Sequence, residues 1–126
     1  MRPLKILAAL AACLPALAAA QPIVVGQSAP LTGSNAEIGK DIRDGAAAWF
    51  KRVNEAGGIN GRKVELVSLD DRNDRKTAGA NTVKLVNENG AVALFGFASA
   101  TLSLDAMPVV KERKVDRKST RLNSSH

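Results

Sequence analysis

The chain has 126 residues with a formal net charge of +6, and only 3% of its residues are aromatic. Residues 1–20 and 116–126 each contribute +2, so residues 21–115 carry a net charge of only +2, which argues against a nucleic-acid partner. The single cysteine and the single histidine, Cys13 and His126, lie in the two terminal segments, so Cys-His and Ser-His-Asp catalytic sets are excluded.

Residues 1–20 have the pattern of a cleavable secretory signal. A positive start at Arg2 and Lys5 is followed by an apolar run and by the small residues Ala18–Ala20 at the expected cleavage point. The apolar run is shorter than the roughly 20 residues of a membrane-spanning helix. The segment that ends at Cys13 also resembles a lipobox, so lipid anchoring is the alternative. Both interpretations predict export from the cytoplasm.

Strand-like and helix-like segments alternate after this signal. In chain order we predict a strand, a helix, a strand, a helix, a strand and a helix, at residues 23–28, 36–56, 63–70, 74–89, 91–97 and 102–114. This order predicts an α/β fold in which a parallel sheet carries helices on both faces. The three strands are short apolar runs, as expected of buried parallel strands.

The first helix, residues 36–56, follows a loop at residues 29–35 and has Asn35 as a plausible N-cap. The loop lacks the Gly-Lys-Ser/Thr sequence of a phosphate-binding loop. Apolar residues of the helix recur at spacings of three and four, which predicts that one face packs on the sheet: Ile38, Ile42, Ala46, Trp49, Val53 and Ala56. We therefore expect Trp49 in the core rather than on a stacking platform.

A helix stop and a tight turn connect the first helix to the second strand. Gly57-Gly58 accepts the left-handed backbone conformation that ends a helix. Asn60-Gly61 is the dipeptide that two-residue hairpin turns prefer.

The acidic run Asp70–Asp74 follows the second strand. It lacks the central glycine and the distal glutamate of a calcium loop, and it offers no carboxylates from separate strands for a receiver-type pocket. We predict that Asp74 caps the second helix and that Asp70 and Asp71 make turn hydrogen bonds. The inward positions predicted for this helix are Ala78, Thr82, Leu85 and Val86.

The third strand is followed by a loop at residues 98–101. Ligands of open parallel sheets lie beyond the carboxyl ends of the strands, where this loop is expected. Ser99 and Thr101 offer hydroxyl groups, and Ala100 and Thr101 offer backbone N–H groups at a helix start, which favours a carboxylate. The alternative is that Ser99, Thr101 and Ser103 only cap the helix.

Three segments together resemble the start of the bacterial branched-chain amino acid (Leu/Ile/Val)-binding proteins, over about residues 23–115: Ala29–Gly33, Glu55–Leu66 and Leu69–Asp74. This resemblance implies the type I periplasmic binding fold and a receptor that delivers a small carboxylate ligand to an ABC permease. In that family the loop after the third strand holds the ligand carboxylate, which implicates Ser99, Ala100 and Thr101, with Leu31 as a further candidate. The family usually has a proline where this chain has Arg75.

The resemblance also implies a domain organisation. Residues 1–20 are expected to be the signal, and residues 21–115 part of the first lobe of a periplasmic protein. Residues 116–126 resemble the translation of a DNA-sequencing adapter, and we expect them not to be native. We expect no cofactor, no metal and no enzymatic activity. A ligand-sensing domain of a receptor or regulator is the alternative function, and an enzyme on a flavodoxin-like sheet is disfavoured.

Overall fold

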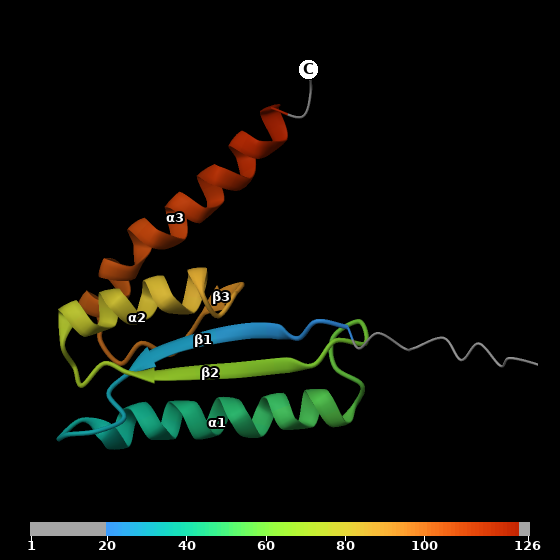
Figure 1. The fold of residues 1–126 in the computed structure, drawn as a ribbon. Helices are drawn as coiled ribbons and strands as arrows, with labels where there is room; N and C mark the ends of the chain where they lie inside the picture. The colour runs from blue at the N-terminus through green and yellow to red at the C-terminus, as the bar shows by residue number, and fades with distance from the viewer. Residues whose placement is uncertain (1–19, 124–126) are drawn as a thin grey trace, which may run out of the picture.

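The computed structural model describes residues 20–123, with side chains through residue 113. A three-stranded parallel sheet has the order β2-β1-β3, so β1 lies in the middle. One face is covered by α1, the other by α2, on which α3 packs (Figure 1). The bounds are β1 Ile23–Ala29, α1 Ala36–Glu55, β2 Val64–Asp70, α2 Arg75–Asn87, β3 Ala93–Leu94 and α3 Ala100–Asn123. The predicted fold class is confirmed.

The two long strands pair along their whole length, whereas the third strand is short. Pairing of β1 with β2 runs from Ile23 opposite Val64 to Ala29 opposite Asp70. In contrast, β3 pairs with β1 at two positions only, and its residues are exposed or half-buried. The prediction of a buried strand over residues 91–97 is therefore wrong. Within residues 20–123 no strand covers the outer edge of β3, and Gly96, at φ 71°, turns the chain away from the sheet.

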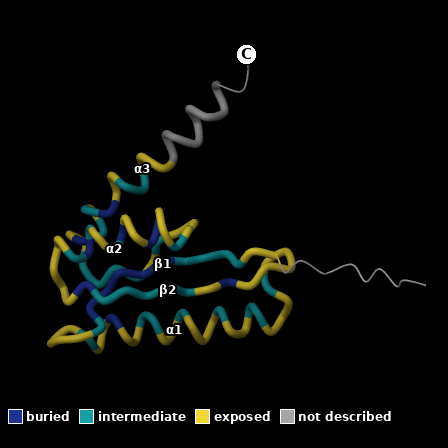
Figure 2. Tube along the Cα trace, in the orientation of Figure 1, coloured by how far each residue is buried: buried dark blue, intermediate teal, exposed yellow. Residues whose placement is uncertain are grey.

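The hydrophobic core lies between β1 and α2, with a contribution from α3 (Figure 2). Leu85 has no exposed surface and packs on Gly26 of β1, where an added Cβ would lie 3.2 Å from the Leu85 Cβ. All inward positions predicted for α2 are buried, namely Ala78, Thr82, Leu85 and Val86. Buried Leu102 and Ala106 of α3 complete this layer.

Helix α1 is rotated relative to the face that its apolar spacing predicts, so that Ile42, Ala46 and Val53 are half-buried as expected but the other three predicted residues are exposed. Ile38 and Trp49 are 55% and 60% exposed, and Ala56 is exposed as well, so the prediction that Trp49 lies in the core is wrong. The Trp49 ring instead lies beside Arg52, whose guanidinium carbon is 5.8 Å from the ring centroid. The less exposed face of the helix runs through Gly39, Ile42, Ala46, Phe50 and Val53.

A close backbone contact explains this rotation of α1. Gly39 is the one buried residue of the helix, and a Cβ at this position would lie 2.0 Å from the carbonyl oxygen of Pro30. The helix can approach the loop after β1 only with its glycine facing Pro30. Trp49 then lies roughly a quarter turn away from the face in contact, at 3.6 residues per turn.

The local turn predictions are confirmed. Gly57 and Gly58 have φ values of 105° and 76°, and the turn at Asn60-Gly61, with φ values of 51° and 75°, closes a bridge between Ile59 and Arg62. Asn54 ties the end of α1 to the start of β2. Its side chain accepts a hydrogen bond from the Val64 amide at 2.8 Å and donates one to the Val64 carbonyl at 2.9 Å.

The start of α1 and both ends of α3 differ from prediction. Asn35 makes no capping hydrogen bond with its side chain. Helix α3 begins at Ala100 rather than at Leu102 or Ser103, because Ser103 donates a backbone hydrogen bond to the Ser99 carbonyl at 3.0 Å. It continues past Lys114 to Asn123, a stretch with no glycine or proline to end it. No helix among the described residues combines the length and the apolar character that crossing a bilayer requires.

Candidate ligand-binding edge of the sheet

The carboxyl ends of β1 and β2 point to the same edge of the sheet, where α1, α2 and α3 all begin (Figure 1). We call this region the carboxyl edge, and define it by residues 30–35, 70–74 and 95–101. Parallel strands direct their following loops to one edge, so the arrangement follows from the β-α order. The predicted site residues Leu31, Ser99, Ala100 and Thr101 all lie in these loops or in the first turn of α3.

Asp70, the last residue of β2, connects two of the three loops. Its Oδ1 accepts hydrogen bonds from the backbone amides of Leu31 and Arg72, each at 2.9 Å, and its Oδ2 accepts one from the Thr32 hydroxyl. The predicted turn bond within the acidic run is therefore confirmed. The bonds to the loop after β1 span 38 and 39 residues of sequence and fix the position of Leu31.

The same contacts set the pKa of Asp70. Burial raises it, but hydrogen bonds from the Thr32 hydroxyl and from the backbone amides of Leu31 and Arg72 outweigh this and lower the pKa from 3.8 to about 2. The folded state therefore favours the carboxylate over the neutral acid. Stability from this group is fully present above pH 4 and is lost as the pH falls toward 2.

Asp71 and Asn81 form a second group of hydrogen bonds beneath the carboxyl edge. Asp71 and Ser28 have no exposed surface, and the Ser28 hydroxyl donates to Asp71 Oδ2 at 3.1 Å. Asp71 Oδ1 accepts from the Asn73 amide at 2.8 Å. Asn81 Nδ2 donates to Ser28 Oγ at 3.2 Å and to the Asp70 carbonyl at 3.0 Å. Both oxygens of the Asp71 carboxylate therefore accept hydrogen bonds from within the protein.

Asp74, the last residue of the acidic run, also has a structural role. Asp74 caps α2 as predicted, because its carboxylate accepts from the amide and the hydroxyl of Thr77, both at 2.7 Å. The hydrogen bonds from Thr77 lower the pKa of Asp74. Within the described part of the chain, no group of three or more His, Cys, Asp or Glu side chains is placed to hold a metal ion.

Polar groups at the start of α3 remain available at this edge. The backbone N–H groups of Ala100 and Thr101 lie in the first turn, where helix geometry provides no acceptor. Ala100 and Thr101 are exposed, while Ser99 and Leu31 are half-buried. The Ser103 hydroxyl donates to the Ser99 carbonyl at 3.0 Å, which is a bond within the helix and leaves the first-turn N–H groups uncapped. The hydroxyls of Ser99 and Thr101 have no hydrogen-bond partner among residues 20–113.

Sequence reasoning missed Gln27 and Asn81 as contributors to this edge. Gln27 has no exposed surface, and its amide contacts α1, β2 and the loop after β3. The available signal was a polar Gln-Ser pair in an otherwise apolar strand, where an amide must find partners within the fold. Asn81 carried no such signal, because an asparagine in a surface helix has many ordinary explanations.

We expect Asp70→Asn to lower the free energy of unfolding at pH 7 by about 1 kcal/mol. The pKa shift corresponds to at most about 2.4 kcal/mol, and the partly open position of the group reduces this value. The difference from the unmodified chain should shrink as the pH falls from 4 to 2. Urea unfolding at several pH values measures it. Asp41→Asn, at an exposed position of α1, is the charge-matched control. An equal effect of both variants would contradict the assignment.

Comparisons with known proteins complete the description. The sequence profile of a family described as periplasmic binding protein matches residues 22–116. An amino acid binding protein of Pseudomonas aeruginosa is 37% identical over 90 residues, which are 71% of this chain and 24% of that protein. The chain therefore spans about a quarter of the length of the curated relatives it matches.

Solved structures agree with the sequence comparison. A possible leucine/isoleucine/valine-binding protein from Rhodopirellula baltica superposes with a TM-score of 0.70 at 26% identity, covering 75% of this chain and 26% of the other. The branched-chain amino acid transporter substrate binding protein LivJ from Streptococcus pneumoniae was solved in complex with isoleucine. It gives a TM-score of 0.68 at 27% identity, covering 72% of this chain and 26% of its own.

Proposed function

The chain belongs to the periplasmic binding protein family, and from this we propose that the protein is an extracytoplasmic solute receptor of an ABC importer. Its ligand would be a branched-chain amino acid or a similar small carboxylate or amide. Relatives whose names specify amino acid or Leu/Ile/Val binding support this ligand class. We further propose that residues 1–20 are a cleaved export signal and that residues 116–126 are foreign to the protein. The partner that accepts the ligand would be the permease of the importer, and the protein would not be an enzyme.

One observation supports the proposed site. Hydrogen-bond donors without a partner among the described residues lie at the start of α3, and the hydrogen bonds of Asp70 fix the neighbouring loop after β1. The hydroxyls of Ser99 and Thr101 and the first-turn amides of α3 can all donate hydrogen bonds to a carboxylate. Leu31, held by Asp70, would contribute an apolar contact. A ligand with a carboxylate at one end and a short aliphatic chain at the other fits this combination of donors and apolar surface.

The described residues provide only one side of such a site. Small-molecule sites bury most of the ligand surface, which takes a second wall opposite the carboxyl edge. In the proposed receptor this wall comes from a second lobe that closes around the ligand by a hinge motion. We therefore expect residues 21–115 alone to bind the ligand weakly or not at all.

Isothermal titration calorimetry of the complete protein against L-leucine, L-isoleucine and L-valine tests the proposal. We expect at least one of them to bind with a Kd of about 1 µM or below. Thr101→Val should weaken that binding about tenfold or more, because the valine keeps the shape of threonine but offers no hydroxyl. Thr77→Val is the matched control, since the Thr77 hydroxyl donates to Asp74 at the start of α2 and not to a candidate ligand-binding residue.

L-leucinamide, which lacks the carboxylate, separates a carboxylate site from a merely apolar one. We expect its binding to be lost or at least about a hundredfold weaker, because the first turn of α3 offers donors to a negative group. Equal binding of L-leucine and L-leucinamide would contradict the assignment of the α3 start. If the folded protein bound none of the three amino acids, the assignment of a branched-chain amino acid as its ligand would be wrong.

A further inference from the structure

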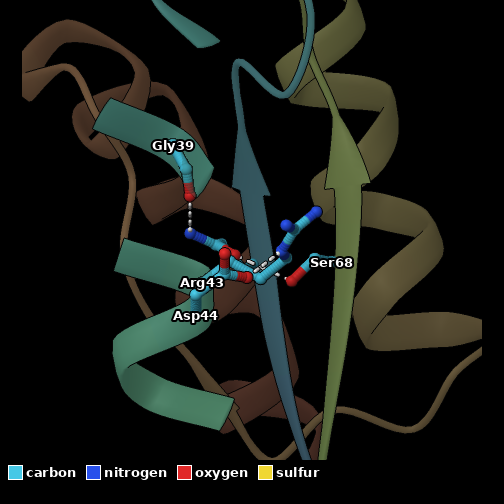
Figure 3. Close-up of polar contacts among 5 residues, drawn as sticks. Gly39, Arg43, Asp44 and Ser68 are labelled. Atoms are coloured by element: carbon cyan, nitrogen blue, oxygen red, sulfur yellow. Dashed lines mark hydrogen bonds and ion pairs between the residues drawn. The ribbon is translucent and has the colours of Figure 1, made fainter. Parts of the chain in front are cut away.

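Gln27 lies in the middle of the sheet with every polar group of its side chain in use. Nε2 donates hydrogen bonds to the carbonyl oxygens of Gly39 in α1 and Gly96 after β3, at 3.4 and 3.3 Å. Oε1 accepts a hydrogen bond from the Ser68 hydroxyl of β2 at 2.7 Å. Figure 3 shows Gly39 and Ser68 on either side of β1.

These partners permit only one orientation of the amide. An amide nitrogen carries two hydrogens, and both are used on carbonyl oxygens. A flipped amide would turn its own oxygen toward the carbonyl oxygens of Gly39 and Gly96, neither of which can donate a hydrogen. Since Gln27 has no exposed surface, water cannot replace a lost partner without rearrangement.

The chain after β3 is fitted closely against this side chain. A Cβ on Gly96 would lie 3.0 Å from Gln27 Nε2 and 2.8 Å from Ile42 Cγ2 of α1. Gly96 also has a positive φ of 71°, which a residue with a side chain rarely adopts. The backbone therefore passes directly over Gln27 and α1 before it reaches Ser99 and the start of α3.

We propose that Gln27 is a positioning residue for the ligand-binding edge, one that ties the segment Gly96–Ser99 to α1 and β2 through its side-chain hydrogen bonds. This inference rests on the proposed function, because a fixed conformation of that segment matters only if the start of α3 binds a ligand. Gln27 itself does not touch the ligand. Its contribution is to keep the donors at the start of α3 in one arrangement before binding, which spares the ligand the cost of ordering them.

Amide hydrogen exchange of the ¹⁵N-labelled chain tests this proposal without a ligand. Gln27→Met keeps the side-chain length but removes all three hydrogen bonds. We expect the Phe95 and Ser103 amides to exchange at least about tenfold faster in this variant, relative to the amides that join β1 to β2. The proposal would be overturned if the amides of Phe95 and Ser103 exchanged no faster than in the unmodified chain, or if the amides that join β1 to β2 were accelerated equally. Ser68→Ala removes one bond and leaves both donations to the loop and α1, so its effect should be smaller.

The unmodified chain provides a second measurement in case Gln27→Met does not fold. The two Nε2 protons of Gln27 should exchange at least about tenfold more slowly than those of exposed Asn87, and they should give nuclear Overhauser effects to Gly39 and Gly96. Exchange at the rate of Asn87 would overturn the proposal.

Ligand binding by the complete protein links the positioning role to function. Gln27→Met should weaken binding of L-leucine about tenfold while the ligand contacts themselves stay unchanged. Binding as tight as in the unmodified protein would overturn the positioning role. If the unmodified protein bound none of the branched-chain amino acids, the proposed function would fail, and hydrogen exchange would still decide the role of Gln27.

Discussion

Replacing Gly39 by alanine is expected to lower the free energy of unfolding by about 2–3 kcal/mol, although alanine normally favours a helix by about 1 kcal/mol over glycine. The reason is the contact between α1 and the loop after β1. The new Cβ would lie 2.0 Å from the Pro30 carbonyl oxygen and 3.3 Å from the Ala29 Cβ. Both neighbours belong to a buried segment that cannot move aside easily, so the helix must shift away from the sheet.

Gly45 provides a matched control within the same helix. A Cβ at Gly45 meets no atom within 4 Å, so Gly45→Ala should stabilise the chain by up to about 1 kcal/mol. Thermal unfolding followed by circular dichroism measures both variants. A stabilising or neutral Gly39→Ala would show that α1 does not approach Pro30 as described.

Gly39→Ala should also disturb the carboxyl edge. The Gly39 carbonyl accepts a hydrogen bond from Gln27, whose amide in turn holds the Gly96 carbonyl. A shift of the first turn of α1 would therefore reach the segment that leads to Ser99. We expect the amide of Phe95 to lose protection in this variant along with the first turn of α1.

Replacing Leu85 by alanine is expected to cost about 2–5 kcal/mol of stability. Leu85 has no exposed surface and fills the space between α2 and the middle strand at Gly26. A domain of this size is stable by only about 5–10 kcal/mol, so the variant should lose a large share of its stability. Chemical denaturation followed by tryptophan fluorescence or circular dichroism gives the midpoint.

Val83→Ala in the same helix is the control for Leu85→Ala. Val83 is 43% exposed, and its truncation leaves no cavity in the core. We expect a change within about 0.5 kcal/mol, of either sign, because alanine has the higher helix propensity. Similar losses from both variants would contradict the placement of the core between β1 and α2.

The order of strands and helices and the face of α2 could be predicted from the sequence because both depend on local patterns. Ala78, Thr82, Leu85 and Val86 recur at helical spacing, and all four are buried. The bounds of β1 and β2 are also close to the predicted ranges. The candidate site could be placed at the carboxyl edge, since parallel strands direct their loops to the same side of a sheet.

The face of α1 and the extent of β3 could not be predicted in the same way. Trp49 lies at the spacing of an inward residue but is 60% exposed, because the contact between Gly39 and Pro30 sets the rotation of the helix. The apolar run over residues 91–97 has the composition of a buried strand. Only Ala93–Leu94 pairs with β1, because Gly96, at φ 71°, turns the chain away from the sheet although β1 continues to Ala29.

The sequence by itself determined the turns, the cap of α2 and the fold class. Gly57-Gly58, Asn60-Gly61 and Asp74 act within a few residues of themselves, through backbone conformations and hydrogen bonds that their side chains favour wherever the chain leads. Only the tertiary structure decided the partners of Asp70 and Gln27. Apart from the bonds to Gly39 and Arg72, their side-chain hydrogen bonds reach across 38 to 69 residues of sequence. Such bonds form only after strand pairing and helix packing have brought the loops together, and no local pattern records which loops will meet.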